Sequence, residues 1–300
     1  MTQSSARINQ AYAWCQALAK SHYENFPVAS ILVPRRLRRA IAAIYAFARS
    51  ADDFADEGDA PQVERLTKLN QYSQLLHQID AGQYSGNDPI FIALQHAIKQ
   101  FSLPVQLFED LLIAFRQDVV KSRYTNFAEV LDYCHYSANP VGRILLYLDG
   151  NPSELQLIQS DAICSALQLI NFCQDIAQDY IEQDRIYIPQ DELVAAGLEE
   201  IDLLHPVTDK IAPLIRSLYQ RSQDLMIQGY QLGISVQGCL GWEIKAMTLG
   251  GMTTLKLLKQ QKDRDLLTRP RLDKVQLLKI IAVSACNRSY LGMATKQMKG

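Results

Sequence analysis

The run from Asp161 to Glu182 is largely apolar and carries a line of polar side chains at helical spacing. The polar positions stand at i, i+3, i+7 and i+11, and they are Gln168, Asn171, Asp175 and Asp179. Because an α-helix advances about 100° per residue, side chains at these offsets share one face. Two carboxylates on an otherwise apolar helix are costly to bury alone, so the pattern predicts a buried helix whose polar face meets something cationic.

The run from Ile41 to Glu57 repeats this pattern on a second predicted helix. Its polar positions stand at i, i+4, i+7 and i+11, and they are Tyr45, Arg49, Asp52 and Asp56. Mg²⁺ in proteins is usually held by one or two carboxylates together with substrate phosphates. We therefore expect several Mg²⁺ ions between the two helices, where they grip a diphosphate. Arg49 would serve as a phosphate clamp, and the apolar walls would line a cavity for hydrocarbon.

Helical periodicity continues through most of the chain, and strand-like alternation bounded by turn residues is hardly visible. The predicted helices cover residues 4–23, 35–57, 61–81, 90–101, 104–123, 126–150 with an interruption at Asn139-Pro140, 191–197, 206–233, 238–261 and 272–297. The helix that contains the run 161–182 is introduced by Asn151-Pro-Ser153. No connection is richer than a turn, and neither a low-complexity tract nor a repeat is present. The sequence therefore predicts one all-α domain over residues 1–300, a helical bundle with a central cavity between the two polar stripes.

Composition and motifs exclude several function classes. The net charge of −2 offers no basic field to nucleic acid, and the six cysteines form no CxxC pair, as is typical of core thiols in a reducing compartment. The histidines show no paired spacing for zinc, and neither a nucleophile elbow nor a P-loop is present. Without a signal-peptide core or an apolar run of the ~20 residues that span a bilayer, we expect a cytoplasmic protein. The basic cluster Arg35–Arg39 leaves open a peripheral contact with a membrane or with phosphate.

Either carboxylate pair alone also fits a solvated helix face. The same offsets in both runs argue against that interpretation, because Tyr45, Asp52 and Asp56 repeat the spacing i, i+7, i+11 of the later run. A non-catalytic helical protein that binds a partner or a lipid is a further alternative. Loss of one pair would be its signature, and both pairs are present.

At these residues the chain resembles the squalene/phytoene synthase family, and the resemblance extends from about Gln10 to Asn287. The first motif is the run from Tyr45 to Asp56, and the second is the run from Gln168 to Asp179 followed by Arg185-Ile-Tyr187. The third is Tyr133-Cys-His-Tyr136 with Val141-Gly142. The resemblance implies one all-α isoprenoid-synthase fold that uses Mg²⁺ to ionise isoprenoid diphosphates.

The resemblance also implies roles for individual residues. The metal would be held or supported by Asp52, Asp53, Asp56, Asn171, Asp175 and Asp179. Catalytic positions near the reacting carbons and the diphosphate would be Tyr133, Gln168, Arg49 and Tyr45. The substrate would further contact Asn25, Phe26, Arg49, Asn171, Gln174 and Arg271.

Within the family, the segment from His22 to Ser30 and the run from Asn171 to Asp175 are most similar to the hopanoid-pathway branch of hydroxysqualene synthases. That branch implies ionisation of presqualene diphosphate, rearrangement of the cation and capture by water, without NADPH. Gln174 stands where phytoene synthases and presqualene-forming relatives usually have Arg, which fits an enzyme that handles one diphosphate. Cys173 stands where the hopanoid branch commonly has Trp. Condensation of two farnesyl diphosphates to presqualene diphosphate or squalene, and phytoene synthesis, are the alternatives within the family.

Overall fold

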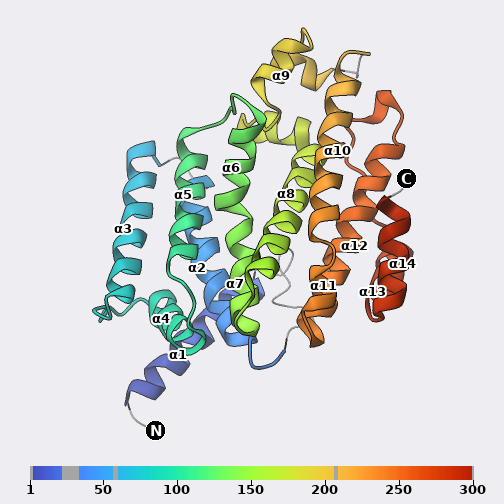
Figure 1. The fold of residues 1–300 in the computed structure, drawn as a ribbon. Coiled ribbons are helices and arrows are strands. Elements are labelled where there is room, and N and C mark those ends of the chain that lie inside the picture. Colours follow the sequence, from blue (N-terminus) through green and yellow to red (C-terminus); the bar gives the residue numbers. More distant parts are fainter. Residues whose placement is uncertain (1–2, 22–33, 57–59, 206–208, 299–300) are drawn as a thin grey trace. The chain divides into compact units, whose positions relative to one another are not determined.

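A computed structural model describes residues 3–21, 34–56, 60–205 and 209–298 (Figure 1). The predicted all-α fold is confirmed, since an isolated bridge between Arg123 and Ile186 is the one β-type pairing among the described residues. The α-helices are α1 Gln3–Ser21, α2 Arg38–Asp56, α3 Gln62–Asp80, α4 Pro89–Phe101, α5 Gln106–Val120, α6 Phe127–Ser137, α7 Asn139–Asp149, α8 Glu154–Gln183, α9 Gln190–Ala195, α10 Ile211–Gly229, α11 Leu232–Ser235, α12 Gly238–Gln260, α13 Lys274–Ser284 and α14 Asn287–Met298. No helix in these ranges is both long enough and apolar enough to cross a bilayer.

The helices belong to two compact units. The first comprises Met1–Val120 with Pro140–Pro152, and the second comprises Lys121–Asn139 with Ser153–Gly300. The predicted interruption at Asn139-Pro140 falls on this division, because α6 ends at Ser137 and α7 begins at Asn139. Proline supplies no backbone donor and is best placed in the first turn of a helix, so the chain restarts here.

The core of the first unit is built around α2. This helix is rich in alanine, which favours helix formation and lets neighbouring helices pack closely. Its Phe47 is fully buried and meets Phe91 and Phe108 edge-on, with ring centroids 6.0 and 5.6 Å away. Edge-to-face pairs at such distances add to the stabilisation from burying the rings. These ring contacts therefore hold α2 in the core of the first unit.

The second unit is organised around α8, which packs against α10 and α12 (Figure 1). It begins with a capping box, in which Ser153 and Gln156 satisfy each other's backbone donors. Gly229 at the end of α10 approaches α8 so closely that a Cβ there would lie 2.5 Å from the carbonyl oxygen of Gln159. The α8 helix ends at Gln183, and its C-cap residue Asp184 adopts the left-handed conformation with φ 51°.

The α8 helix begins at Glu154, directly after the segment Asn151-Pro-Ser153 that the sequence predicts to introduce it. Two other predicted helices are divided in the structure. The predicted helix over residues 206–233 is α10 followed by the short α11, and the final predicted helix is divided into α13 and α14 around Ala285. In both cases the apolar pattern continues through the break, so periodicity alone does not reveal it.

Candidate functional site

The first carboxylate pair lies in the last two turns of α2. Arg49 Nη2 is 2.7 Å from Asp53 Oδ1, and Nη1 is 3.5 Å from Asp52 Oδ2, so one guanidinium serves two carboxylates. Asp56 is the last residue of the helix and is exposed. No basic residue lies in the last turn. The C-terminal end of a helix carries a partial negative charge, so acidic side chains there are electrostatically unfavourable. A bound cation would offset this repulsion.

One turn earlier on the same face, Tyr45 borders a small apolar cavity of about 50 Å³ within the first unit. Tyr45 is buried, and burial raises the pKa of its hydroxyl, while Arg49 lowers it. The cavity wall comes from α2, α5 and α7 and consists, besides Tyr45, of Ile41, Ile44, Ala48, Leu111, Val141, Ile144, Leu145 and Leu148. An apolar space therefore lies on the same helix as the carboxylate pair, one to two turns before it.

The second pair lies on α8, and its cation in this structure is Arg269. The guanidinium Nε of Arg269 is 3.1 Å from Oδ1 of Asp175, whose side chain is 19% exposed. That buried oxygen has no hydrogen bond, so the contact is an ion pair without good donor geometry. One helical position earlier, Gln174 Nε2 donates to the carbonyl oxygen of Pro270 at 3.0 Å. Residues 269–270 are thus attached to the polar face of α8.

The two carboxylates of α8 affect each other's protonation. Burial, together with the neighbouring charge of Asp175, raises the pKa of Asp179 to about 7, and the charge of Arg185 opposes both effects. Burial also raises the pKa of Asp175, against the effect of Arg269. A site that disfavours negative charge in this way favours any cation that can neutralise both groups.

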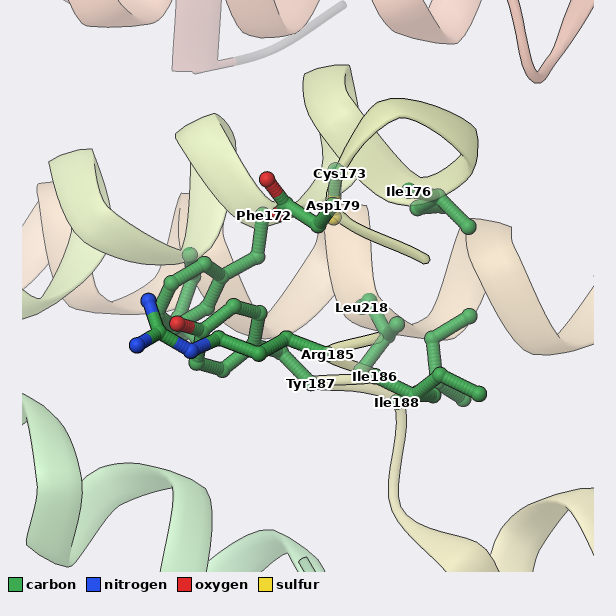
Figure 2. A pocket seen from close by; sticks show the side chains of 10 residues that line it. Phe172, Cys173, Ile176, Asp179, Arg185, Ile186, Tyr187, Ile188 and Leu218 are labelled. Atoms are coloured by element: carbon green, nitrogen blue, oxygen red, sulfur yellow. The ribbon is translucent and has the colours of Figure 1, made fainter. Parts of the chain in front are cut away.

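An aromatic cluster lies beside Asp179 within the second unit (Figure 2). The rings of Phe172 and Tyr187 stack with centroids 3.6 Å apart and planes inclined by 6°. Tyr133 from α6 and Tyr124 lie within 5.6 Å of the Tyr187 ring centroid. Figure 2 shows these stacked rings and Arg185 on one side of a pocket, whose lining is Leu169, Phe172, Cys173, Ile176, Asp179, Arg185, Ile186, Tyr187, Ile188 and Leu218.

The loop that carries Tyr187 is held by backbone hydrogen bonds. The amide of Ile186 donates to the carbonyl oxygen of Ser122, and the amide of Gln190 donates to that of Tyr124, each at 2.9 Å. Arg123 reinforces this pairing through ion pairs with Asp184 at 2.6 Å and Glu200 at 2.7 Å. The loop after α8 is therefore fixed and holds Tyr187 against Phe172.

The structure brings the predicted residues together within each unit. Tyr45, Arg49 and the three aspartates of α2 form one group in the first unit. The second unit holds Tyr133, Gln168, Asn171, Gln174, Asp175 and Asp179, with Tyr133 buried, Gln168 half-buried and Asn171 exposed. Asn25 and Phe26 lie outside the described residues.

Two site residues were not predicted from the sequence. The first is Arg269, which makes the contact with Asp175, while Arg271, the guanidinium expected to contact the substrate, is also exposed and stays a prediction. The two arginines flank one proline, so the sequence offers no signal that separates them. Tyr124 was also missed, because it lies in a connection without periodicity and joins the cluster only through the loop pairing.

The donor set fits Mg²⁺. Among the described ranges, no group of three or more His, Cys, Asp or Glu side chains is gathered in a way that could hold a metal ion. Each helix nevertheless offers carboxylates one turn apart, and Asp175 has a buried oxygen that no hydrogen bond satisfies. Mg²⁺ needs only one or two carboxylates when phosphate oxygens complete its shell, so these hard oxygen donors suit it.

Comparison with known proteins agrees with this arrangement. Residues 19–276 match the squalene/phytoene synthase family model. The chain is 38% identical over 223 residues to a hydroxysqualene synthase of Rhodopseudomonas palustris, covering 71% of this chain and 74% of the relative. It is 37% identical over 241 residues to a hydroxysqualene synthase of Zymomonas mobilis, covering 76% of this chain and 79% of the relative.

A solved structure shows the same fold. The crystal structure of squalene synthase HpnC from Alicyclobacillus acidocaldarius superposes with a TM-score of 0.79 at 34% identity, covering 88% of this chain and 97% of that one. The family match spans most of the chain and contains both aspartate motifs. The chain therefore belongs to the squalene/phytoene synthase family.

Proposed function

We propose that this enzyme converts presqualene diphosphate and water to hydroxysqualene and diphosphate, as its curated relatives' name indicates. The observation that carries the proposal is 37–38% identity to two hydroxysqualene synthases over about three quarters of each chain. The local geometry supports it, because each unit presents carboxylates one helical turn apart beside an apolar cavity. The proposal requires both units to act as one catalytic domain.

The carboxylates of α2 and α8 would bind the diphosphate through Mg²⁺. Asp52, Asp56, Asp175 and Asp179 would be ligands, with Asp53 and Asn171 supporting them. When bound, Mg²⁺ supplies Lewis-acid stabilisation of the negative charge that the departing diphosphate gains. Arg49 and Arg269 already lie against these carboxylates, where each guanidinium can turn to a phosphate oxygen.

The reaction needs a site that tolerates a carbocation. The bond between carbon and the diphosphate oxygen breaks with both electrons on the oxygen, and the cyclopropylcarbinyl cation rearranges. A water oxygen then bonds to the cationic carbon and releases a proton. Tyr133, Phe172 and Tyr187 supply aromatic rings on this side of the site, and an aromatic ring attracts a cation through the negative part of its quadrupole.

The environment of Gln174 favours one diphosphate over two. Its side-chain amide is neutral and donates to Pro270, so position 174 supplies no charge for a second diphosphate. A condensing enzyme that binds two farnesyl diphosphates has to neutralise twice as much phosphate. This observation supports the proposal over the condensation alternative, and the experiment below distinguishes the two.

Purified enzyme with Mg²⁺ should be incubated with presqualene diphosphate in ¹⁸O-labelled water, and separately with farnesyl diphosphate alone. The expected result is hydroxysqualene carrying one ¹⁸O from the first incubation and no consumption of farnesyl diphosphate in the second. Formation of presqualene diphosphate from farnesyl diphosphate in the second incubation, with presqualene diphosphate ignored in the first, would overturn the proposal.

A further inference from the structure

The apolar face of α13 is exposed in the part of the chain that the structure describes. Four large apolar side chains of this eleven-residue helix are at least 44% exposed: Val275 74%, Leu277 45%, Leu278 68% and Ile281 44%. Ala282 and Ala285 are exposed between them. Offsets of three and four place these residues on one continuous stripe, while Ile280 and Ser284 face the unit's core. A contiguous exposed apolar stripe of this kind marks an interaction surface.

The charges around this stripe are mainly basic, with Asp273 at the N-cap of α13 as an acidic exception. Lys274 and Lys279 on α13 and Arg288 on α14 are exposed, and Arg271 is exposed just before the helix. From residue 274 to residue 298 the chain has four basic residues and no acidic one, whereas the whole protein has a net charge of −2. Apolar side chains bordered by lysine and arginine are complementary to a bilayer surface with anionic headgroups.

A short segment, residues 269–273, links the start of α13 to the polar face of α8. Asp273 and Gln276 form a capping box that fixes the start of α13. Three residues earlier, Pro270 accepts the hydrogen bond from Gln174, and Arg269 pairs with Asp175. Only a few residues therefore separate the surface from the polar face of α8, all of them within the second unit.

The basic cluster at residues 35–39 is a weaker membrane candidate. Arg36 is paired with Asp149 at 2.7 Å. Arg39 donates to Asn9 at 2.7 Å and lies over the ring of Tyr12, 4.4 Å from its centroid. These side chains are engaged inside the first unit, whereas the cations of α13 flank exposed apolar groups.

We propose that the α13 face (Lys274, Val275, Leu277, Leu278, Lys279 and Ile281) docks the enzyme on an anionic lipid bilayer. The helix lies in the headgroup plane, with its apolar stripe in the acyl boundary and its lysines at the phosphates. The docking surface follows from the exposed residues of α13 and does not depend on the reaction. The purpose of docking, which is exchange of a water-insoluble triterpene with the bilayer, rests on the proposed function.

Vesicle flotation tests this docking without any activity measurement, so its outcome is independent of the proposed reaction. The wild type should float with vesicles of phosphatidylcholine and phosphatidylglycerol. Val275→Glu with Leu278→Glu should weaken partition by about tenfold or more, because two charges enter the apolar stripe. Lys274→Gln with Lys279→Gln should weaken it by about twentyfold on anionic vesicles only.

The matched control is Val194→Glu, since Val194 lies on α9 of the same unit and is also 74% exposed. It should float like the wild type. Equal loss in the control, or unchanged flotation of both α13 variants, would overturn the proposal. A third result would also overturn it: the wild type sediments as a dimer, the α13 variants sediment as monomers, and neither binds vesicles. The α13 face would then join two copies of the chain.

Quenching of tryptophan fluorescence tests whether α13 is the segment that contacts the bilayer. Trp242 donates from its indole Nε1 to Ser284 Oγ at 2.8 Å and so lies against α13. The second tryptophan of the chain, Trp14, can be removed as Trp14→Phe. Brominated lipids should then quench Trp242 emission in the wild-type α13 background and leave it unquenched in the glutamate variants. Quenching that is the same in both backgrounds would contradict docking through α13.

Discussion

Among single residues, Asp175 is a proposed ligand of Mg²⁺. Asp175→Asn removes the anionic ligand but keeps the shape and relieves a buried charge, so the fold should persist. We expect the rate of diphosphate release to fall by about 100-fold or more, as for other groups that stabilise transition-state charge. Asp132→Asn, an exposed aspartate on α6, is the control. Wild-type turnover in Asp175→Asn, with its circular dichroism unchanged, would contradict the assignment.

Arg269 and Arg271 offer a matched pair on either side of Pro270. Both side chains are exposed, and Arg269 lies 3.1 Å from Asp175. Losing a charge-assisted hydrogen bond to phosphate costs about 1.5–3 kcal/mol, so Arg269→Gln should lower kcat/KM by about 10- to 100-fold. Arg271→Gln should change it by less than about threefold when the substrate is dispersed in detergent. Steady-state kinetics would contradict the choice of Arg269 if the order were reversed.

Glu243 predicts a pH-dependent stability unrelated to the catalytic site. It is 7% exposed on α12, and burial raises its pKa to about 7 from an ordinary value near 4.5. The folded state therefore holds this proton more tightly than the unfolded state, and stability decreases as the pH rises from about 4.5 through 7. Glu243→Gln should add on the order of 2–3 kcal/mol at pH 8 and less than about 1 kcal/mol at pH 5. Urea titrations at both pH values measure this, and an equal effect at both would refute it.

At the scale of helices, glycines distinguish close packing from open space. A Cβ on Gly229 would lie 2.5 Å from the backbone of α8, so Gly229→Ala should destabilise the fold by about 1–3 kcal/mol. A Cβ on Gly250 of α12 meets nothing within 4 Å. Gly250→Ala should therefore stabilise by about 0.5–1 kcal/mol through helix propensity. Thermal unfolding of both variants tests the packing of α10 on α8, and two shifts of the same sign would contradict it.

The helices and their polar faces were predictable because they follow from local rules. Periodicity located α2 and α8, and Pro140 marked the break between α6 and α7. The division between α13 and α14 was not predictable, because the apolar pattern runs through it. Tyr124 and Arg269 join the site only through contacts distant in sequence, namely the pairing of residues 122–124 with the loop after α8 and the ion pair with Asp175. Such contacts leave no periodic signal.

At the scale of the whole molecule, the carboxylates are divided between two compact units, α2 in one and α8 in the other. Each unit has its own aromatic or apolar pocket beside its carboxylates. A diphosphate bound through Mg²⁺ to both helices would hold the units together. We therefore expect Mg²⁺ with a diphosphate-bearing substrate analogue to raise the unfolding temperature, and each alone to raise it little. Differential scanning calorimetry measures this, and an equal shift with Mg²⁺ alone would contradict the coupling.

The most direct test is a crystal structure of the enzyme with Mg²⁺ and a non-hydrolysable presqualene diphosphate analogue. The account predicts one cluster of Mg²⁺ ions on the diphosphate, with oxygens of Asp52 or Asp56 and of Asp175 or Asp179 about 2.0–2.1 Å from the metals. A diphosphate bound by only one of the two helices, with the other pair of aspartates directed to solvent, would contradict it.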